Sequence, residues 1–319
     1  MTRPGKAPEG QIADAVSGNW VDKSAPEAWK PYFRLSRLDR PIGTWLLLLP
    51  CWWGLFLGSV HTGTFTWHDL WIFAGCGIGA ILMRGAGCTW NDITDRDIDG
   101  SVARTALRPI PAGDVTARQA LGWAVAQCLV AFLILLTFNT AAIALGILAL
   151  LPVAIYPFAK RFTWWPQIFL GLAFNWGALL AWTAHTGSLG WPAVLLYLSG
   201  MGWTLFYDTI YAHQDKEDDA LIGVKSTARL FGDRTPRFLA MFLVGATLLM
   251  AGAVWIALPP NAPLTATLVA LGPIAFAIHL ARQLARTELD NHDRLLALFR
   301  SNRDAGLLPV LFFAGAAFV

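Results

Sequence analysis

Two groups of acidic residues have the residue types and spacing of a divalent-metal site. In the first group Asn91, Asp95 and Asp99 repeat every four residues. Asp92 stands three residues before Asp95, so all four side chains share one face if this segment is helical. Oxygen ligands of this kind suit Mg²⁺, which accepts one or two carboxylates together with water and substrate phosphate. Like charges at this spacing destabilise a helix, so we expect positive side chains to compensate them.

The second acidic group follows a later apolar stretch of the chain. Asp208, Asp215 and Asp219 stand at i, i+7 and i+11, the positions of one helical face, with Tyr211 between them. Asp208 directly follows apolar residues, and a carboxylate at or below a membrane surface is costly enough to indicate a function. Solvated acidic loops are the plain alternative, and matched spacing in two groups argues against it. For three residues off the shared faces that alternative stays open: Asp97, Glu217 and Asp218.

Basic residues near both groups could bind a diphosphate. Arginine offers a bidentate fork to phosphate oxygens, and lysine a compact positive charge. A general excess of basic residues on one side of a membrane also explains many of these positions. The candidates are Arg40, Arg104, Arg108, Lys160, Arg161 and Lys225.

The elements that position these groups are predicted to be membrane helices. Of 319 residues, 55% are hydrophobic and 14% are charged, whereas soluble domains carry about 25% charged residues. A helix needs ~20 mainly apolar residues to cross the ~30 Å hydrocarbon core. We therefore expect an all-α integral membrane protein with about nine spans: 42–60, 70–90, 119–138, 141–158, 166–185, 191–207, 238–258, 264–281 and 305–319.

The placement of basic residues supports this number of spans. Alternate connections contain no Lys or Arg, and the other connections and the N-terminal tail hold all 24 basic residues except Arg84. By the positive-inside rule, the N-terminus and both acidic groups face the cytoplasm. We expect a polar cytoplasmic tail over 1–39, partly disordered or lying on the membrane surface. The transmembrane domain is then 40–319.

The residues around both acidic groups resemble the UbiA superfamily of intramembrane prenyltransferases. Its first signature is similar to N-D-x-x-D-x-x-x-D at 91–99, followed by R-P-x-P-x-G at 108–113. Its second signature is similar to 207–227, in the form found in 4-hydroxybenzoate polyprenyltransferases. Segments 37–43 and 156–171 also fit that subgroup. The resemblance covers nearly the whole chain after the polar tail, which departs from the family pattern.

The resemblance implies a reaction and a set of site residues. A polyprenyl group would pass from polyprenyl diphosphate to the ring of 4-hydroxybenzoate, ortho to the hydroxyl, in ubiquinone biosynthesis. Mg²⁺ would be held, with help from Asn91, by the six carboxylates that act as catalytic and metal-binding residues: Asp92, Asp95, Asp99, Asp208, Asp215 and Asp219. The substrate-binding residues would be Arg40, Asn91, Arg104, Arg108, Lys160, Arg161, Tyr211 and Lys225.

Within that set, Arg161 is the first candidate for binding the carboxylate of the acceptor, and Arg40 the second. We expect a multi-pass protein of the bacterial inner membrane with its active site facing the cytoplasm. Its partners would be the two substrates and the lipid bilayer, with no nucleic acid and no obligate protein partner.

Two alternatives remain open from the sequence. A related prenyltransferase could use another aromatic acceptor, such as homogentisate, a naphthoate or haem. A cation transporter would also carry acidic residues within membrane spans, but near the bilayer midplane instead of at one face.

Overall fold

The described residues of the chain are almost entirely helical. A computed structural model describes residues 18–100, 105–221 and 223–319, and within these ranges it contains helices and no strands. The prediction of an all-α protein is therefore confirmed.

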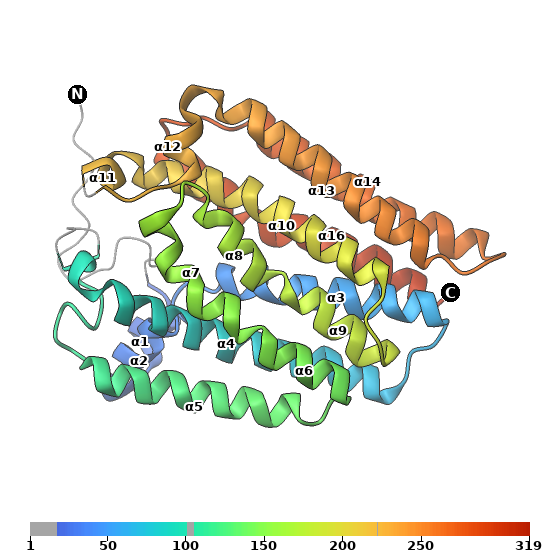
Figure 1. The fold of residues 1–319 in the computed structure, drawn as a ribbon, viewed down its shortest axis with the longest axis horizontal. Coiled ribbons are helices and arrows are strands. Elements are labelled where there is room, and N and C mark those ends of the chain that lie inside the picture. The colour runs from blue at the N-terminus through green and yellow to red at the C-terminus, as the bar shows by residue number, and fades with distance from the viewer. Residues whose placement is uncertain (1–17, 101–104, 222) are drawn as a thin grey trace. The chain divides into compact units, whose positions relative to one another are not determined.

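The helices follow one another along the chain (Figure 1). The N-terminal part contains α1 (Trp20–Ser24), η1 (Glu27–Trp29) and α2 (Lys30–Leu35). The remaining elements are α3 (Ile42–Thr62), α4 (Trp67–Asp99), α5 (Ala117–Leu135), α6 (Thr140–Leu148), α7 (Leu150–Phe162), α8 (Pro166–Phe174), α9 (Trp176–Thr186), α10 (Trp191–Ala212), η2 (His213–Asp215), α11 (Lys216–Leu221), α12 (Thr227–Phe231), η3 (Gly232–Arg234), α13 (Thr235–Ala257), α14 (Pro263–Ala285), α15 (His292–Arg300) and α16 (Asn302–Ala317).

All nine predicted spans fall on helices. Within the described ranges, seven helical segments are long and apolar enough to cross a membrane. The other two predicted spans correspond to α10 and α16. Helix α16 has only 16 residues, and α10 carries Trp, Tyr and Asp side chains that lower its apolarity. The number nine and the orientation of the N-terminus stay predictions.

Two of the predicted spans are each divided into two helices. The first divides at Ala149, between α6 and α7. Pro152 then lies in the first turn of α7, where its missing N–H is tolerated, whereas in the interior of one continuous helix it would remove a hydrogen bond. The second divides at Asn175. The Asn175 side chain is buried, and its Nδ2 donates to the Gly171 carbonyl at 2.9 Å and to Thr204 Oγ1 of α10 at 2.8 Å. Where a helix is interrupted inside the membrane, no water is present, so the freed polar groups must be satisfied by bonds of this kind within the protein.

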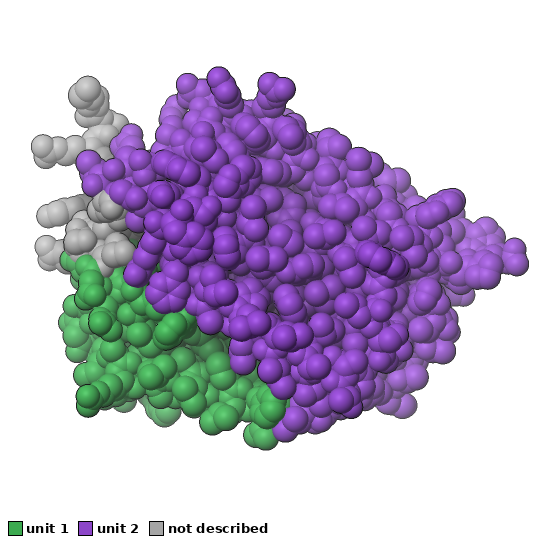
Figure 2. Space-filling model, viewed as in Figure 1, with its two compact units in different colours: residues 1–44, 81–133 green, residues 45–80, 134–319 purple. Residues whose placement is uncertain are grey.

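The chain forms two compact units, shown in different colours in Figure 2. Unit 1 comprises residues 1–44 and 81–133, and unit 2 comprises residues 45–80 and 134–319. The first acidic group belongs to unit 1 and the second to unit 2.

In unit 1, hydrogen bonds and apolar contacts join the end of α2 to α5. Ser36 Oγ receives a hydrogen bond from Trp123 Nε1 at 2.8 Å and donates one to Gln127 Oε1 at 3.1 Å. Leu35 is fully buried in an apolar cluster with Val115 and Ala120. These contacts fix the turn that follows α2, from which two arginines of the candidate site extend.

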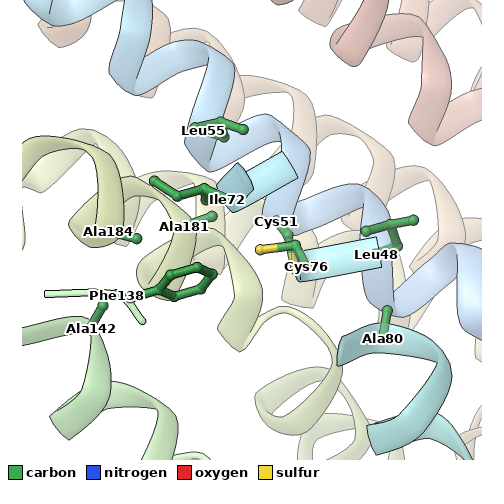
Figure 3. Close-up of a cluster of buried hydrophobic side chains, with 10 residues drawn as sticks. All are labelled: Leu48, Cys51, Leu55, Ile72, Cys76, Ala80, Phe138, Ala142, Ala181 and Ala184. Carbon is green, nitrogen blue, oxygen red and sulfur yellow. The ribbon is translucent and has the colours of Figure 1, made fainter. Parts of the chain in front are cut away.

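Unit 2 has an apolar cluster built largely from small side chains (Figure 3). The cluster contains Leu48, Cys51, Leu55, Ile72, Cys76, Ala80, Phe138, Ala142, Ala181 and Ala184. Beside it, α3 and α9 approach so closely that a Cβ on Gly54 would lie 2.4 Å from the Ala178 carbonyl oxygen. Small residues permit this approach, which is how helices associate in membranes without a hydrophobic driving force. Farther along the chain, α10 packs on α13, and α14 on α16 (Figure 1).

We predict that Gly200→Ala destabilises the protein. A Cβ on Gly200 would lie 2.1 Å from Asn175 Oδ1, and Asn175 cannot move away without breaking its two hydrogen bonds. Such overpacking typically costs about 1–3 kcal/mol. Thermal unfolding of the purified protein in detergent measures the effect. Gly122→Ala is the matched control, because a Cβ there meets nothing within 4 Å. Equal melting temperatures for the two variants would contradict the role assigned to Gly200.

Candidate active site

The first acidic group lies at the C-terminal end of α4. The helix continues to Asp99, as the spacing predicts. Asp92, Asp95 and Asp99 are all buried, with exposed fractions of 0%, 1% and 5%. Carboxylates are rarely buried unless they are paired or bind a metal. The burial of three on one helix end marks this region as a candidate site.

Two arginines from other segments pair with these carboxylates. Arg37 Nη2 lies 2.6 Å from Asp92 Oδ1, and Arg108 Nη1 lies 2.6 Å from Asp99 Oδ2 and 3.4 Å from Asp92 Oδ1. The expected positive compensation is therefore present. Burial raises the pKa of Asp99, and the nearby charge of Arg108 opposes that shift.

The loop after α4 is tied to the acidic group. Thr105 Oγ1 donates to the Asp99 carbonyl at 2.8 Å, and the Arg108 amide donates to the Thr105 carbonyl at 2.9 Å. These bonds explain how a loop delivers Arg108 to carboxylates on the helix. Arg104, another predicted phosphate ligand, lies outside the described residues.

Arg40 and its neighbour Asp39 lie in the same unit. Arg40 Nε stands 3.7 Å from Asp39 Oδ1. Burial raises the pKa of Asp39, and the charges of Arg40 and Arg37 oppose this. The backbone at Arg37 has φ 57°, a left-handed conformation uncommon for a non-glycine residue. A strained, buried arginine was not among the residues predicted for the site.

The second acidic group spans three successive helical elements instead of one. Asp208 lies in α10, Asp215 in the 3₁₀ turn η2, and Asp219 in α11. The prediction that the three carboxylates share one face assumed an unbroken α-helix. A 3₁₀ turn has about three residues per turn instead of ~3.6, so the α-helical spacing does not hold across η2. All three carboxylates are half-buried.

Hydrogen bonds fix the segment that carries this second group. Val224 N donates to the Asp219 carbonyl at 2.9 Å, and Arg229 Nη1 donates to the same carbonyl at 3.2 Å and to the Val224 carbonyl. Farther along, Thr209 and Thr227 share a hydrogen bond of 2.7 Å. Arg229 was not predicted for this role, because nothing in the sequence distinguishes it from the other basic residues of the predicted cytoplasmic connections.

The predicted phosphate ligands Lys160 and Lys225 lie next to each other. The Lys225 amide donates to the Lys160 carbonyl at 3.2 Å. The Lys225 ammonium lies 6.0 Å from the centre of the Trp164 ring, which the Arg229 guanidinium also contacts at 5.3 Å. The structure therefore places two cations, Lys225 and Arg229, against one tryptophan.

Two more predicted substrate ligands lie against aromatic rings. Tyr211 packs on Phe299 of α15 with ring centres 4.4 Å apart. Arg161 is exposed at the end of α7, with its guanidinium 5.3 Å from the centre of the Phe158 ring. His213 lies within the second acidic group, between Asp208 and Asp215. Burial lowers the pKa of His213 to about 4, and its Nε2 shares a hydrogen bond of 3.0 Å with Thr235 Oγ1.

The donor atoms fit a magnesium ion that retains water and phosphate ligands. Among the described residues, no three His, Cys, Asp or Glu side chains form a ready-made metal cage. Mg²⁺ does not require one, since it usually binds one or two carboxylates plus substrate phosphate. Asp92 Oδ2 is buried and has no hydrogen-bond partner in the described part of the chain. An oxygen of that kind is a suitable ligand.

Solved structures share this fold. The apo UbiA homolog from Aeropyrum pernix K1 has a TM-score of 0.63 at 24% identity, over 86% of this chain and 96% of that one. A UbiA homolog from Archaeoglobus fulgidus, solved with GPP and Mg²⁺, has a TM-score of 0.62 at 19% identity, over 91% of this chain and all of its own. At these identities the likeness establishes the fold.

Curated relatives are similar over most of the chain. The mitochondrial 4-hydroxybenzoate polyprenyltransferase of Rattus norvegicus is 49% identical over 303 residues, which are 93% of this chain and 77% of the relative. The Homo sapiens protein of the same name is 48% identical over 93% of this chain and 78% of its own. The prediction of a bacterial inner membrane is corrected here, because these relatives are mitochondrial proteins. The multi-pass membrane character stands.

The match also holds at the level of the whole family. The model of the UbiA prenyltransferase family matches residues 47–303, which include both acidic groups. The predicted resemblance to the UbiA superfamily is thereby confirmed. The chain belongs to the UbiA prenyltransferase family.

Proposed function

We propose that this chain transfers a polyprenyl group from polyprenyl diphosphate to 4-hydroxybenzoate in ubiquinone biosynthesis. The observation that carries this is the 49% identity over 93% of the chain to a 4-hydroxybenzoate polyprenyltransferase. The reaction breaks the C–O bond between the prenyl group and diphosphate and forms a C–C bond ortho to the hydroxyl. Diphosphate and the ring proton leave.

We propose Mg²⁺ as the cofactor. When bound, it supplies positive charge that stabilises the leaving diphosphate. Support comes from the buried oxygen ligands of the first acidic group and from the archaeal homolog solved with GPP and Mg²⁺. The proposed ligands are Asp92, Asp95, Asp99, Asp208, Asp215 and Asp219, with Asn91 assisting.

Basic and aromatic side chains then bind the two substrates. Arg108, Lys160 and Lys225 would neutralise the remaining phosphate charge, together with Arg104. Arg161 would bind the carboxylate of the acceptor, with Arg40 as the second candidate, and Tyr211 would contact substrate. The apolar helices keep water away from the allylic cation, which water would otherwise convert to an alcohol.

An acceptor assay tests the proposed function. Purified protein in lipid nanodiscs is supplied with polyprenyl diphosphate, Mg²⁺ and either 4-hydroxybenzoate or homogentisate. We expect prenylated 4-hydroxybenzoate, detected by mass spectrometry, and no product when EDTA removes the metal. A preference for homogentisate would refute the proposed acceptor. Undiminished product in EDTA would refute the metal requirement.

We predict that Asp95→Asn and Asp208→Asn each lower turnover by at least about 100-fold, the loss expected when a group that stabilises transition-state charge is removed. Initial rates at saturating substrate measure this. Asp97→Asn and Glu217→Gln are the matched controls, since both side chains are exposed, and should keep the wild-type rate. Wild-type turnover in either site variant, with normal membrane insertion, would remove that residue from the mechanism.

Arg161→Ala should raise KM for 4-hydroxybenzoate roughly 10-fold or more, since a charged hydrogen bond contributes about 1.5–3 kcal/mol. KM for polyprenyl diphosphate should change little. Steady-state kinetics with each substrate varied in turn give both constants. Arg118→Ala, at an exposed basic position, controls for loss of surface charge. Equal rises in both KM values would show that Arg161 does not select the acceptor.

A further inference from the structure

Arg37 is the principal partner of the most deeply buried carboxylate. Its Nη2 lies 2.6 Å from Asp92 Oδ1, and the exposed fractions of the two side chains are 9% and 0%. Arg108 approaches the same oxygen only to 3.4 Å and makes its short contact with Asp99. A charge removed from water at this depth requires a well-formed partner, and Arg37 provides it.

The backbone of Arg37 adopts a strained conformation to make this contact. Its φ of 57° is one of two positive values among the described non-glycine residues. A left-handed conformation is unfavourable for a residue with a Cβ, which comes too close to the following carbonyl oxygen. The turn is nevertheless closed by hydrogen bonds from Arg37 N to the Arg34 carbonyl at 3.1 Å and from Leu38 N to the Phe33 carbonyl at 3.0 Å. The surrounding structure thus holds the strain in place.

Side chains of α5 hold this turn in place, and one of them also packs against α4. Ser36, next to Arg37, is held by Trp123 and Gln127 of α5. Gln127 Oε1 in turn packs against α4, where a Cβ on Gly85 would lie 1.9 Å from it. The second guanidinium nitrogen of Arg37 is also occupied, because Nη1 donates to the Arg34 carbonyl at 3.0 Å. Arg37 is therefore committed to Asp92 and its own turn, unlike a cation that is available to a substrate.

We propose that Arg37 is a positioning residue, which holds Asp92 through Oδ1 and leaves Oδ2 to ligate the divalent cation. This inference rests on the proposed function. Two observations carry it: the bond to Oδ1 at 2.6 Å, and the buried Oδ2, which has no hydrogen-bond partner within the described ranges. A residue bound to one oxygen of a ligating carboxylate fixes the direction of the other, and removing such a partner typically lowers metal affinity by about 10- to 100-fold.

Metal binding measured without turnover tests this role. Mn²⁺ replaces Mg²⁺, and electron paramagnetic resonance follows its binding to the protein in the presence of inorganic diphosphate. We expect Arg37→Gln to weaken Mn²⁺ binding by about 10- to 100-fold, and Arg37→Lys, which keeps the charge and loses the fork, to fall in between. Arg34→Gln is the matched control, since Arg34 pairs with Asp22 in the same short segment, and its affinity should stay near wild type.

A double-variant comparison separates positioning from general damage. If Arg37 acts through Asp92, then Arg37→Gln should weaken Mn²⁺ binding no further in protein that already carries Asp92→Asn. A full additional loss, or wild-type affinity in Arg37→Gln alone, overturns the inference. If Arg37→Gln fails to fold, Arg37→Lys and Ser36→Ala are measured instead. The proposal then requires weakened Mn²⁺ binding in both variants, and wild-type affinity in either one overturns it.

The same measurements keep this inference distinct from the proposed function. If wild-type protein binds Mn²⁺ with diphosphate but does not prenylate 4-hydroxybenzoate, the proposed function fails while the role of Arg37 in metal binding is still read directly. If wild-type protein makes the product and Arg37→Gln binds Mn²⁺ normally, only the role of Arg37 fails.

Discussion

The burial of three carboxylates at the end of one helix is the constraint on which unit 1 depends. Asp92, Asp95 and Asp99 are almost fully removed from solvent, and charges in that position repel one another unless cations are placed among them. The two cations are Arg37, which precedes the acidic group in the sequence, and Arg108, which follows it. The turn after α2 and the described residues 105–108 place these two guanidinium groups.

The two acidic groups are built differently. The first has buried carboxylates on a continuous helix of 33 residues. The second is half-buried on a helix end, a 3₁₀ turn and a short helix, fixed by the Arg229 contacts with main-chain carbonyls. A magnesium ion tolerates both arrangements, because water and phosphate complete its coordination.

The sequence was sufficient to predict the helical segments and to single out the two acidic groups, whose roles as ligands stay predictions. Apolar length, basic-residue placement and the repeat of Asn91, Asp95 and Asp99 are local patterns, and local patterns survive folding. The pairing of Arg37 with Asp92 joins residues 55 positions apart and depends on a left-handed turn that no spacing rule indicates. The 3₁₀ turn η2 was also not predicted, because the spacing of Asp208, Asp215 and Asp219 is the same in a continuous α-helix and in one interrupted by a 3₁₀ turn. The role of Arg229 requires knowing where its guanidinium points.

The interruption at Asn175 bears on how the chain enters the bilayer during synthesis. Its two half-helices have 9 and 11 residues, or about 14 and 17 Å at 1.5 Å per residue, so neither alone reaches across ~30 Å of hydrocarbon. The polar groups at the junction are satisfied in part by Thr204, which emerges from the ribosome later. The two helices together form one segment of 21 residues that is long enough to cross the membrane, and its break at Asn175 gains the bond to Thr204 only once α10 has packed beside it.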